Sequence, residues 1–215
     1  MLEKKYLLFD FDGTIADSFK HGLEIYNQVA PWLKLMPINN EKEFSLLRDK
    51  PSDESLIDLG ITGYKLPLFY LSTRYLYSKQ IERVPVFPGL KTCLIELKHH
   101  GYELILLSAN TTSNLRKFLA YNEIDVFTKT YGNLSMYHRD KAITKICRRL
   151  KIPINQCTYI GDEIRDINAA KKLNMKMIAV AFGGFNSRQS LLNAHPPKLI
   201  DTPQQLLVEL TGHPR

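Results

Sequence analysis

Two aspartates separated by one residue are the clearest chemical feature of the sequence. Asp10 and Asp12 follow the apolar run at residues 6–9, which predicts a short buried strand. Alternation along a strand places both carboxylates on one side of the pleat, and Gly13 allows a sharp turn directly after them. Neighbouring carboxylates repel unless a cation lies between them. Because Mg²⁺ binds carboxylates together with substrate phosphate oxygens, the pair predicts a Mg²⁺ site. The simpler alternative is an acidic turn that only ends a strand.

A second pair of acids supports the metal interpretation. An apolar run at residues 157–160 leads into Gly161-Asp162, and a predicted helix begins directly afterwards. Asp166 lies four residues beyond Asp162, about one helical turn, and can therefore reach the same region. Asp162 could instead act only as a helix N-cap. That alternative does not explain why the chain has two pairs of aspartates, each placed at the end of a predicted strand.

A hydroxyl group and a cation complete the set of candidate residues. Ser108 ends the predicted strand at 103–107, and a hydroxyl donor at a strand end can stabilise developing negative charge on a bound group. This signal alone is weak, because any strand can end in serine. Lys141 and Arg139 are basic residues at the start of the helix predicted at 140–150. The alternative for Lys141 is a solvated position on a helix surface.

Strand and helix patterns alternate regularly in the second half of the chain. This alternation predicts an α/β fold, a Rossmann-like mainly parallel sheet with helices on both faces. Ligands of such sheets bind at the carboxyl ends of the strands, where Asp10, Ser108 and Asp162 fall. The predicted strands lie at 102–107, 126–130, 157–160 and 177–180, and the predicted helices at 112–121, 140–150, 163–173 and after Pro203.

Residues 18–83 have a different pattern. Helical periodicity is found at 19–29, twice within 41–59 and at 66–83, without a convincing strand. Two prolines and a glycine within 84–90 then mark the return to strand-bearing sequence. The pattern predicts a helical unit, residues 18–83, inserted into a core formed by residues 1–17 and 84–215.

Composition excludes several classes of protein. The 215 residues are 44% hydrophobic, as expected for a globular chain, and no apolar run reaches the length of a membrane span. The net charge of +7 is spread along the chain without a recognised nucleic-acid-binding motif, so we expect no nucleic-acid partner. The three cysteines form no CxxC pair, which suits reduced thiols. We expect a cytoplasmic protein, monomeric or homodimeric.

Four stretches in order resemble the motifs of the haloacid dehalogenase superfamily. FDFDGTIADS at 9–18 resembles motif one, DxDGT, in its phosphoglycolate-phosphatase-like branch. Ser108-Ala109-Asn110 resembles motif two, and GDEIRDINAA at 161–170 resembles motif four, GDSxxDxxAA. Lys141 is the best match to motif three, with Arg139 in reserve, because Ala142 stands where the family often has proline. The resemblance covers almost the whole chain and implies a helical-bundle cap directly after motif one.

The resemblance implies a role for each candidate residue. Asp10 would attack phosphorus to form an aspartyl-phosphate, and Asp12 would act as general acid and base. Ser108 would bind the phosphoryl group and Lys141 would offset its charge. The metal residues implied for Mg²⁺ are Asp10, Asp12 through its main-chain carbonyl, Asp162, and Asp166 through water or by positioning a neighbour. The residues expected to contact the substrate are Thr14, Asn110, Arg48 and Lys50.

The implied activity is Mg²⁺-dependent hydrolysis of a small phosphomonoester, phosphoglycolate or a similar compound. Acids at both Asp10 and Asp12 argue against cleavage of carbon-halogen and carbon-phosphorus bonds. Two alternatives remain open, a sugar phosphomutase of the β-phosphoglucomutase type and a non-catalytic protein that binds a phosphorylated ligand. Arg48 and Lys50 lie in the cap segment that faces the active site in this branch, and the alternative for them is two exposed bases.

Overall fold

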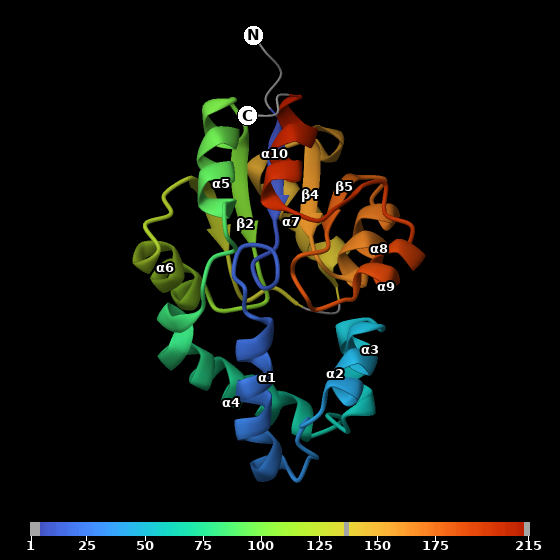
Figure 1. The fold of residues 1–215 in the computed structure, drawn as a ribbon. Coiled ribbons are helices and arrows are strands. Elements are labelled where there is room, and N and C mark those ends of the chain that lie inside the picture. The colour runs from blue at the N-terminus through green and yellow to red at the C-terminus, as the bar shows by residue number, and fades with distance from the viewer. Residues whose placement is uncertain (1–4, 136–137, 213–215) are drawn as a thin grey trace.

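The computed structural model describes residues 5–135 and 138–212, and within them six strands form one parallel sheet (Figure 1). The strand order is β3-β2-β1-β4-β5-β6. The prediction of a mainly parallel α/β sheet is confirmed. The strands are β1 (Tyr6–Phe9), β2 (Glu103–Leu107), β3 (Phe127–Tyr131), β4 (Cys157–Gly161), β5 (Lys176–Val180) and β6 (Leu199–Ile200).

Register brings the carboxyl ends of the three central strands level with one another. Phe9 of β1 pairs with Leu106 of β2 on one side and with Ile160 of β4 on the other. Asp10 therefore leaves the sheet beside the ends of both neighbours. The geometry of the sheet alone thus gathers the polar residues that follow β1, β2 and β4.

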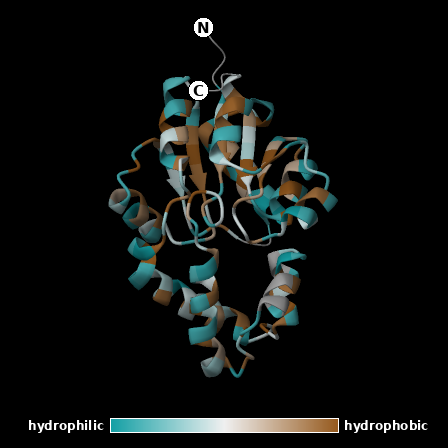
Figure 2. Ribbon diagram, in the orientation of Figure 1, coloured by the Kyte–Doolittle hydropathy of each residue, from teal (hydrophilic) through white to brown (hydrophobic). Residues whose placement is uncertain are grey.

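Helices cover both faces of the sheet, because successive strand residues point to opposite faces. Leu7 and Phe9 pack into the core beneath α5, α6 and α10, whereas Leu8 packs into the core beneath α7, α8 and α9. Figure 2 shows the hydrophobic strands enclosed between these layers. The bounds are α5 (Leu90–His99), α6 (Thr112–Tyr121), α7 (Arg139–Leu150), α8 (Ile164–Lys172), α9 (Arg188–Asn193) and α10 (Pro203–Thr211), with a short 3₁₀ helix η3 (Ile154–Gln156) before β4.

The remaining helices lie beyond the carboxyl edge of the sheet (Figure 1). They surround a small apolar core of their own, centred on Tyr26, Ile38 and Ile61. Together they form the segment that the sequence predicts as an inserted cap, and we keep 18–83 as its proposed bounds. The helices are α1 (Phe19–Val29), η1 (Ala30–Leu33), α2 (Glu41–Arg48), α3 (Ser52–Asp58), α4 (Lys65–Gln80) and η2 (Ile81–Arg83).

Two contacts fix the cap relative to the sheet. The entering and leaving segments run side by side, with an Ala16–Val86 bridge and a 2.9 Å hydrogen bond from Asp17 N to Pro85 O. On the other side, the fully buried Asn186 donates through Nδ2 to the Lys50 carbonyl at 2.6 Å. The cap thus contacts the core at its hinge and also at the loop after β5.

Two short elements were missed by the sequence patterns. β6 has two residues and α9 has six, so neither is long enough to show a clear period. Among the described residues, no helix combines the length and apolarity needed to cross a membrane.

The packing of Phe11 provides a test of how the core supports the catalytic edge. Phe11 lies between Asp10 and Asp12, is fully buried, and contacts Phe118 of α6 edge to face at 4.9 Å between ring centroids. We expect Phe118→Ala to lower the free energy of unfolding by about 3–5 kcal/mol, because it leaves a cavity beneath Phe11. Urea denaturation would measure this change.

The matched control is Tyr121→Ala, which truncates an exposed ring on the same helix. It should change stability by no more than about 0.5 kcal/mol. Equal effects from the two variants would contradict the packing described here.

Candidate active site

Asp10 lies at the centre of the polar cluster and is almost fully buried. Its backbone N–H donates to Ile160 O at 2.9 Å, which ties the residue to the neighbouring strand β4. Its Oδ1 accepts a hydrogen bond from Phe11 N at 2.8 Å. Hydrogen bonds with the backbone therefore help to orient the Asp10 carboxylate independently of other side chains.

Arg139 holds the other oxygen of this carboxylate. Its guanidinium lies 2.6 Å from Asp10 Oδ2 and 3.2 Å from Asp166 Oδ1, and the side chain is buried. Burial alone would lower the pKa of Arg139, but Asp10 and further acids raise it well above its ordinary value. The structure therefore places a fixed positive charge beside Asp10 and Asp166.

Lys141, the residue favoured for this cation, does not reach the cluster. Its side chain is exposed on the outer surface of α7, beside Asp140, Thr144 and Arg148. Residues two positions apart in an α-helix are separated by about 200° around its axis, so Arg139 and Lys141 point in nearly opposite directions. The placement corrects the order of preference and puts Arg139 at the position expected of motif three.

The periodicity of α7 contained the signal that would have identified Arg139. The buried residues of this helix are Arg139, Ile143, Ile146 and Cys147, which lie on one face. Arg139 continues the apolar face toward the sheet, and Lys141 does not. A charged residue on the buried face of a helix indicates a partner in the interior.

Asp162 is held against the backbone of the motif-one turn. Its carboxylate accepts from Thr14 Oγ1 at 3.3 Å and from Phe185 N at 3.4 Å. Burial, and then the charges of Glu163 and nearby acids, raise its pKa well above the ordinary value. Thr14, expected to contact substrate, therefore supports Asp162 in this structure.

Glycine at position 183 is needed for this close approach. A Cβ atom there would lie 2.2 Å from Gly13 O and 2.3 Å from Asp162 Oδ2. The Gly183-Gly184 pair is visible in the sequence, but only the fold shows that it packs on the motif-one turn. Sequence reasoning missed this constraint.

Asp166 has a structural partner on each side. One carboxylate oxygen accepts from Glu163 N at 3.3 Å within a reciprocal capping box at the start of α8. The other faces Arg139. Burial raises the pKa of Asp166 to about 7, although the Arg139 charge opposes this shift. Of the two roles considered for Asp166, these contacts favour positioning a neighbour.

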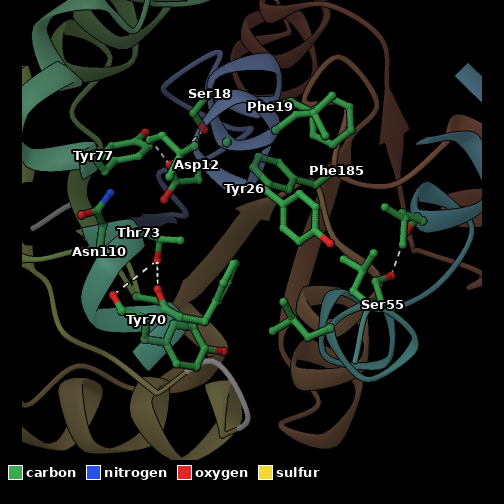
Figure 3. Close-up of a pocket in the computed structure, with 18 of the residues that line it drawn as sticks. Asp12, Ser18, Phe19, Tyr26, Ser55, Tyr70, Thr73, Tyr77, Asn110 and Phe185 are labelled. Carbon is green, nitrogen blue, oxygen red and sulfur yellow. Dashed lines mark hydrogen bonds between the residues drawn. The ribbon is translucent and has the colours of Figure 1, made fainter. Parts of the chain in front are cut away.

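Asp12 faces the cap side of the cluster. Its Oδ1 accepts from Tyr77 Oη at 2.7 Å and from Ser18 Oγ at 2.9 Å, and Figure 3 shows the carboxyl group between these two residues. Burial raises the pKa of Asp12 to about 6, while both hydrogen bonds lower it. Tyr77 comes from α4, so a cap residue contacts the candidate acid and base. No local sequence pattern indicates this contact, which joins residues 65 positions apart.

Ser108 and Asn110 form an ordered loop after β2. Ser108 is buried and its Oγ accepts from Asn110 N at 2.9 Å. Asn110 Oδ1 accepts from Thr111 N at 2.8 Å and from Asn114 Nδ2 at 2.9 Å. Asn110 also lines the cavity beside Asp12. Both residues thus lie where motif two was predicted.

Arg48 and Lys50 have partners outside the cluster. Lys50 forms an exposed ion pair with Asp58 within the cap, and the Arg48 guanidinium lies 5.4 Å from the centroid of the Phe19 ring. Neither side chain lines the cavity next to Asp12. Their backbone carbonyls instead accept hydrogen bonds from Asn186 at 3.0 and 2.6 Å. In this structure the segment therefore acts through its backbone, in docking the cap.

The charges at the site fit a hard divalent cation. Among the described residues, no three His, Cys, Asp or Glu side chains are already grouped as a metal cage. Mg²⁺ does not need one, because it is usually held by one or two carboxylates together with waters and phosphate oxygens. The buried carboxyl groups outnumber the guanidinium groups beside them, and the excess negative charge suits a bound cation. The buried acids are Asp10, Asp162, Glu163 and Asp166, with the half-buried Asp12 beside them, and the cations are Arg139 and Arg165.

Comparison with known proteins agrees with this geometry. The family model described as haloacid dehalogenase-like hydrolase matches residues 7–180. A phosphoglycolate phosphatase from Synechococcus elongatus is 29% identical over 206 residues, covering 95% of this chain and 96% of that protein. A phosphoglycolate phosphatase from Psychrobacter arcticus is 25% identical over 218 residues, covering 93% of each.

The fold is shared with solved structures of similar length. A predicted phosphatase from Clostridium acetobutylicum superposes with a TM-score of 0.83 at 20% identity, over 98% of this chain and 99% of that chain. The family match spans β2, β3, β4, β5 and most of β1, the cap, and the four stretches that carry the candidate catalytic and metal residues. The chain therefore belongs to the haloacid dehalogenase-like hydrolase family.

Proposed function

We propose that the protein is a Mg²⁺-dependent phosphatase that hydrolyses a small phosphomonoester through an aspartyl-phosphate on Asp10. The contact of Arg139 with Asp10 carries this proposal. It leaves a buried, oriented carboxylate beside a permanent positive charge, with Ser108 and Asp12 close by. The names of the curated relatives support phosphomonoester hydrolysis and make phosphoglycolate the first substrate to test.

The first half-reaction uses both aspartates of motif one. The Asp10 carboxylate attacks phosphorus, the ester P–O bond breaks, and protonated Asp12 gives its proton to the departing oxygen. The guanidinium of Arg139 and the donors around Ser108 and Asn110 would stabilise charge on the phosphoryl oxygens. The products of this step are the free alcohol and an aspartyl-phosphate.

The second half-reaction restores the enzyme. Asp12, now a carboxylate, removes a proton from water as the water attacks phosphorus, and the bond between phosphorus and Asp10 breaks. Inorganic phosphate leaves, Asp10 returns as a carboxylate and Asp12 is again protonated. One side chain thus serves in turn as acid and base, which suits a pKa of about 6.

Asp10, Asp162 and the backbone carbonyl of Asp12 would hold Mg²⁺, with Asp166 keeping Arg139 in place. Bound Mg²⁺ would supply positive charge that offsets the approach of a phosphate dianion to these acids. The buried, free cysteines are consistent with action in the cytoplasm.

The nucleophile can be tested by the isosteric variant Asp10→Asn. We expect phosphate release from phosphomonoesters to require Mg²⁺, to stop with EDTA, and to fall at least about 10³-fold in Asp10→Asn. Phosphate release would be measured on purified proteins, with Asp140→Asn, on the surface of α7, as the control. A folded Asp10→Asn protein that keeps a tenth of the activity would exclude the covalent mechanism. Transfer of phosphate between sugar positions without release would indicate a mutase.

The choice between Arg139 and Lys141 is tested by a pair of variants. Arg139→Lys keeps the charge but cannot reach Asp10 and Asp166 together, so we expect kcat/KM to fall by about 10–100-fold. Lys141→Ala removes an exposed side chain and should leave kcat/KM within about threefold. The opposite ranking would return the motif-three role to Lys141.

The protonation of Asp12 is tested through stability in metal-free protein. Its pKa rises from 3.8 to about 6 on folding, so ionisation penalises the folded state. The protonated form of Asp12 therefore favours the folded state, and this contribution to stability is fully present below about pH 4 and is lost as pH rises through about 6. Asp12→Asn keeps the acceptor for Tyr77 and Ser18 but cannot ionise. Urea denaturation should show Asp12→Asn to be more stable by about 3 kcal/mol at pH 8, with the difference vanishing as pH falls below about 4. A difference that does not change with pH would refute the raised pKa.

A further inference from the structure

We propose that the natural leaving group is an apolar or aromatic alcohol larger than the two-carbon glycolate of phosphoglycolate. This inference rests on the proposed phosphatase function and concerns the substrate part beyond the phosphoryl group. It comes from the cavity between the cap helices and the carboxyl edge of the sheet, drawn in Figure 3.

The position of the cavity identifies what must occupy it. Asp12 and Asn110 form one end, so a substrate whose ester oxygen lies at Asp12 extends its alcohol portion into the cavity. The volume is about 310 Å³. This volume lies at the lower end of the range for small-molecule pockets, about 300–1,000 Å³. Glycolate would fill only a small part of it.

The walls are largely aromatic. Rings from α1, from α4 and from the loop after β5 surround the space, and Figure 3 shows Tyr26 and Phe185 on one side of it and Tyr70 on the other. Planar rings on several sides favour an apolar or aromatic occupant. The ring-bearing residues that line the cavity are Phe19, Tyr26, Phe69, Tyr70, Tyr77 and Phe185.

Three hydroxyl groups of the cap wall donate to the chain itself. Tyr26 donates to Met36 O at 2.7 Å, Ser55 to Leu47 O at 3.0 Å, and Thr73 to Phe69 O at 2.8 Å. Figure 3 shows the Thr73 and Ser55 bonds as dashed lines. A sugar entering this space would lose water from its hydroxyls and find these donors occupied, which is costly.

The arginines of the wall also have partners. Arg74 donates to Ala109 O at 3.0 Å, and Arg165 forms an ion pair with Glu163. Nε and Nη1 of Arg165 are buried without a hydrogen-bond partner, so a carboxylate could bind there, but glycolate would leave the aromatic walls of the cavity uncovered. An apolar group needs no such partner and gains from leaving water. The cavity therefore selects for apolar surface on the alcohol.

Two alkyl esters that differ by one ring provide the test. Ethyl phosphate and 2-phenylethyl phosphate both release an alkyl alcohol, so their ester bonds have similar intrinsic reactivity. With Mg²⁺ present, we expect kcat/KM for 2-phenylethyl phosphate to exceed that for ethyl phosphate and for phosphoglycolate at least tenfold. A ratio near one, or a preference for phosphoglycolate, would overturn the inference.

Variants on α4 locate the effect in the cavity. Phe69→Ala removes a ring of the wall and should reduce the preference for 2-phenylethyl over ethyl phosphate to about threefold or less. Leu71→Ala truncates an exposed side chain of the same helix and should leave the preference unchanged. Equal loss in both variants would place the selectivity elsewhere and contradict the assignment.

Binding separates this inference from the proposed function. Calorimetry on Asp10→Asn with Mg²⁺ should give a Kd for 2-phenylethyl phosphate at least tenfold lower than for ethyl phosphate. Turnover of all three esters without a preference, and with equal Kd values, would refute the inference and leave the phosphatase intact. Tighter binding of the phenyl ester without any phosphate release would support the cavity assignment and refute the proposed catalytic function.

Discussion

Burial of excess negative charge at the carboxyl edge of the sheet is the constraint on which the site depends. Asp10, Asp162 and Asp166 are almost fully removed from water, and burial raises the pKa of both Asp162 and Asp166. Arg139 is the cation in contact with Asp10 and with Asp166. A site built in this way resists folding without positive charge, and the same property would favour a divalent cation and a transferring phosphoryl group.

The cap is connected to this chemistry through Asp12. Ser18 at the start of the cap and Tyr77 near its end both donate to the same oxygen of Asp12. The residue proposed to protonate the leaving group is therefore positioned by the unit whose aromatic side chains surround that group. Asn186 ties the opposite side of the cap to the core through the Arg48 and Lys50 carbonyls. A displaced cap would change substrate contacts and acid-base geometry together.

Glycines allow the acids to approach the backbone. Asp162 packs directly on the motif-one turn, where Gly13 has a φ of +74° and Gly183 leaves no space for a side chain. The ends of β1, β2 and β4 thus each contribute a polar side chain to the site, and the loop after β5 contributes the glycine that leaves room for Asp162. Gly13 and Gly183 are therefore required by the packing of the charged cluster and not by the packing of the apolar core.

The sequence by itself determined the central elements and the acids that follow them. The apolar runs of β1, β2 and β4 are buried on both faces and stand out as continuous stretches, so Asp10, Ser108 and Asp162 could be placed at strand ends from local pattern alone.

Tertiary structure decided the rest. The choice of Arg139 over Lys141 depends on which face of α7 meets the sheet, and the roles of Tyr77 and Asn186 depend on contacts between segments far apart in the chain. Local sequence records whether a segment can be a helix or a strand. It does not record how a helix is rotated or where an inserted unit docks, because those are set by packing between distant elements.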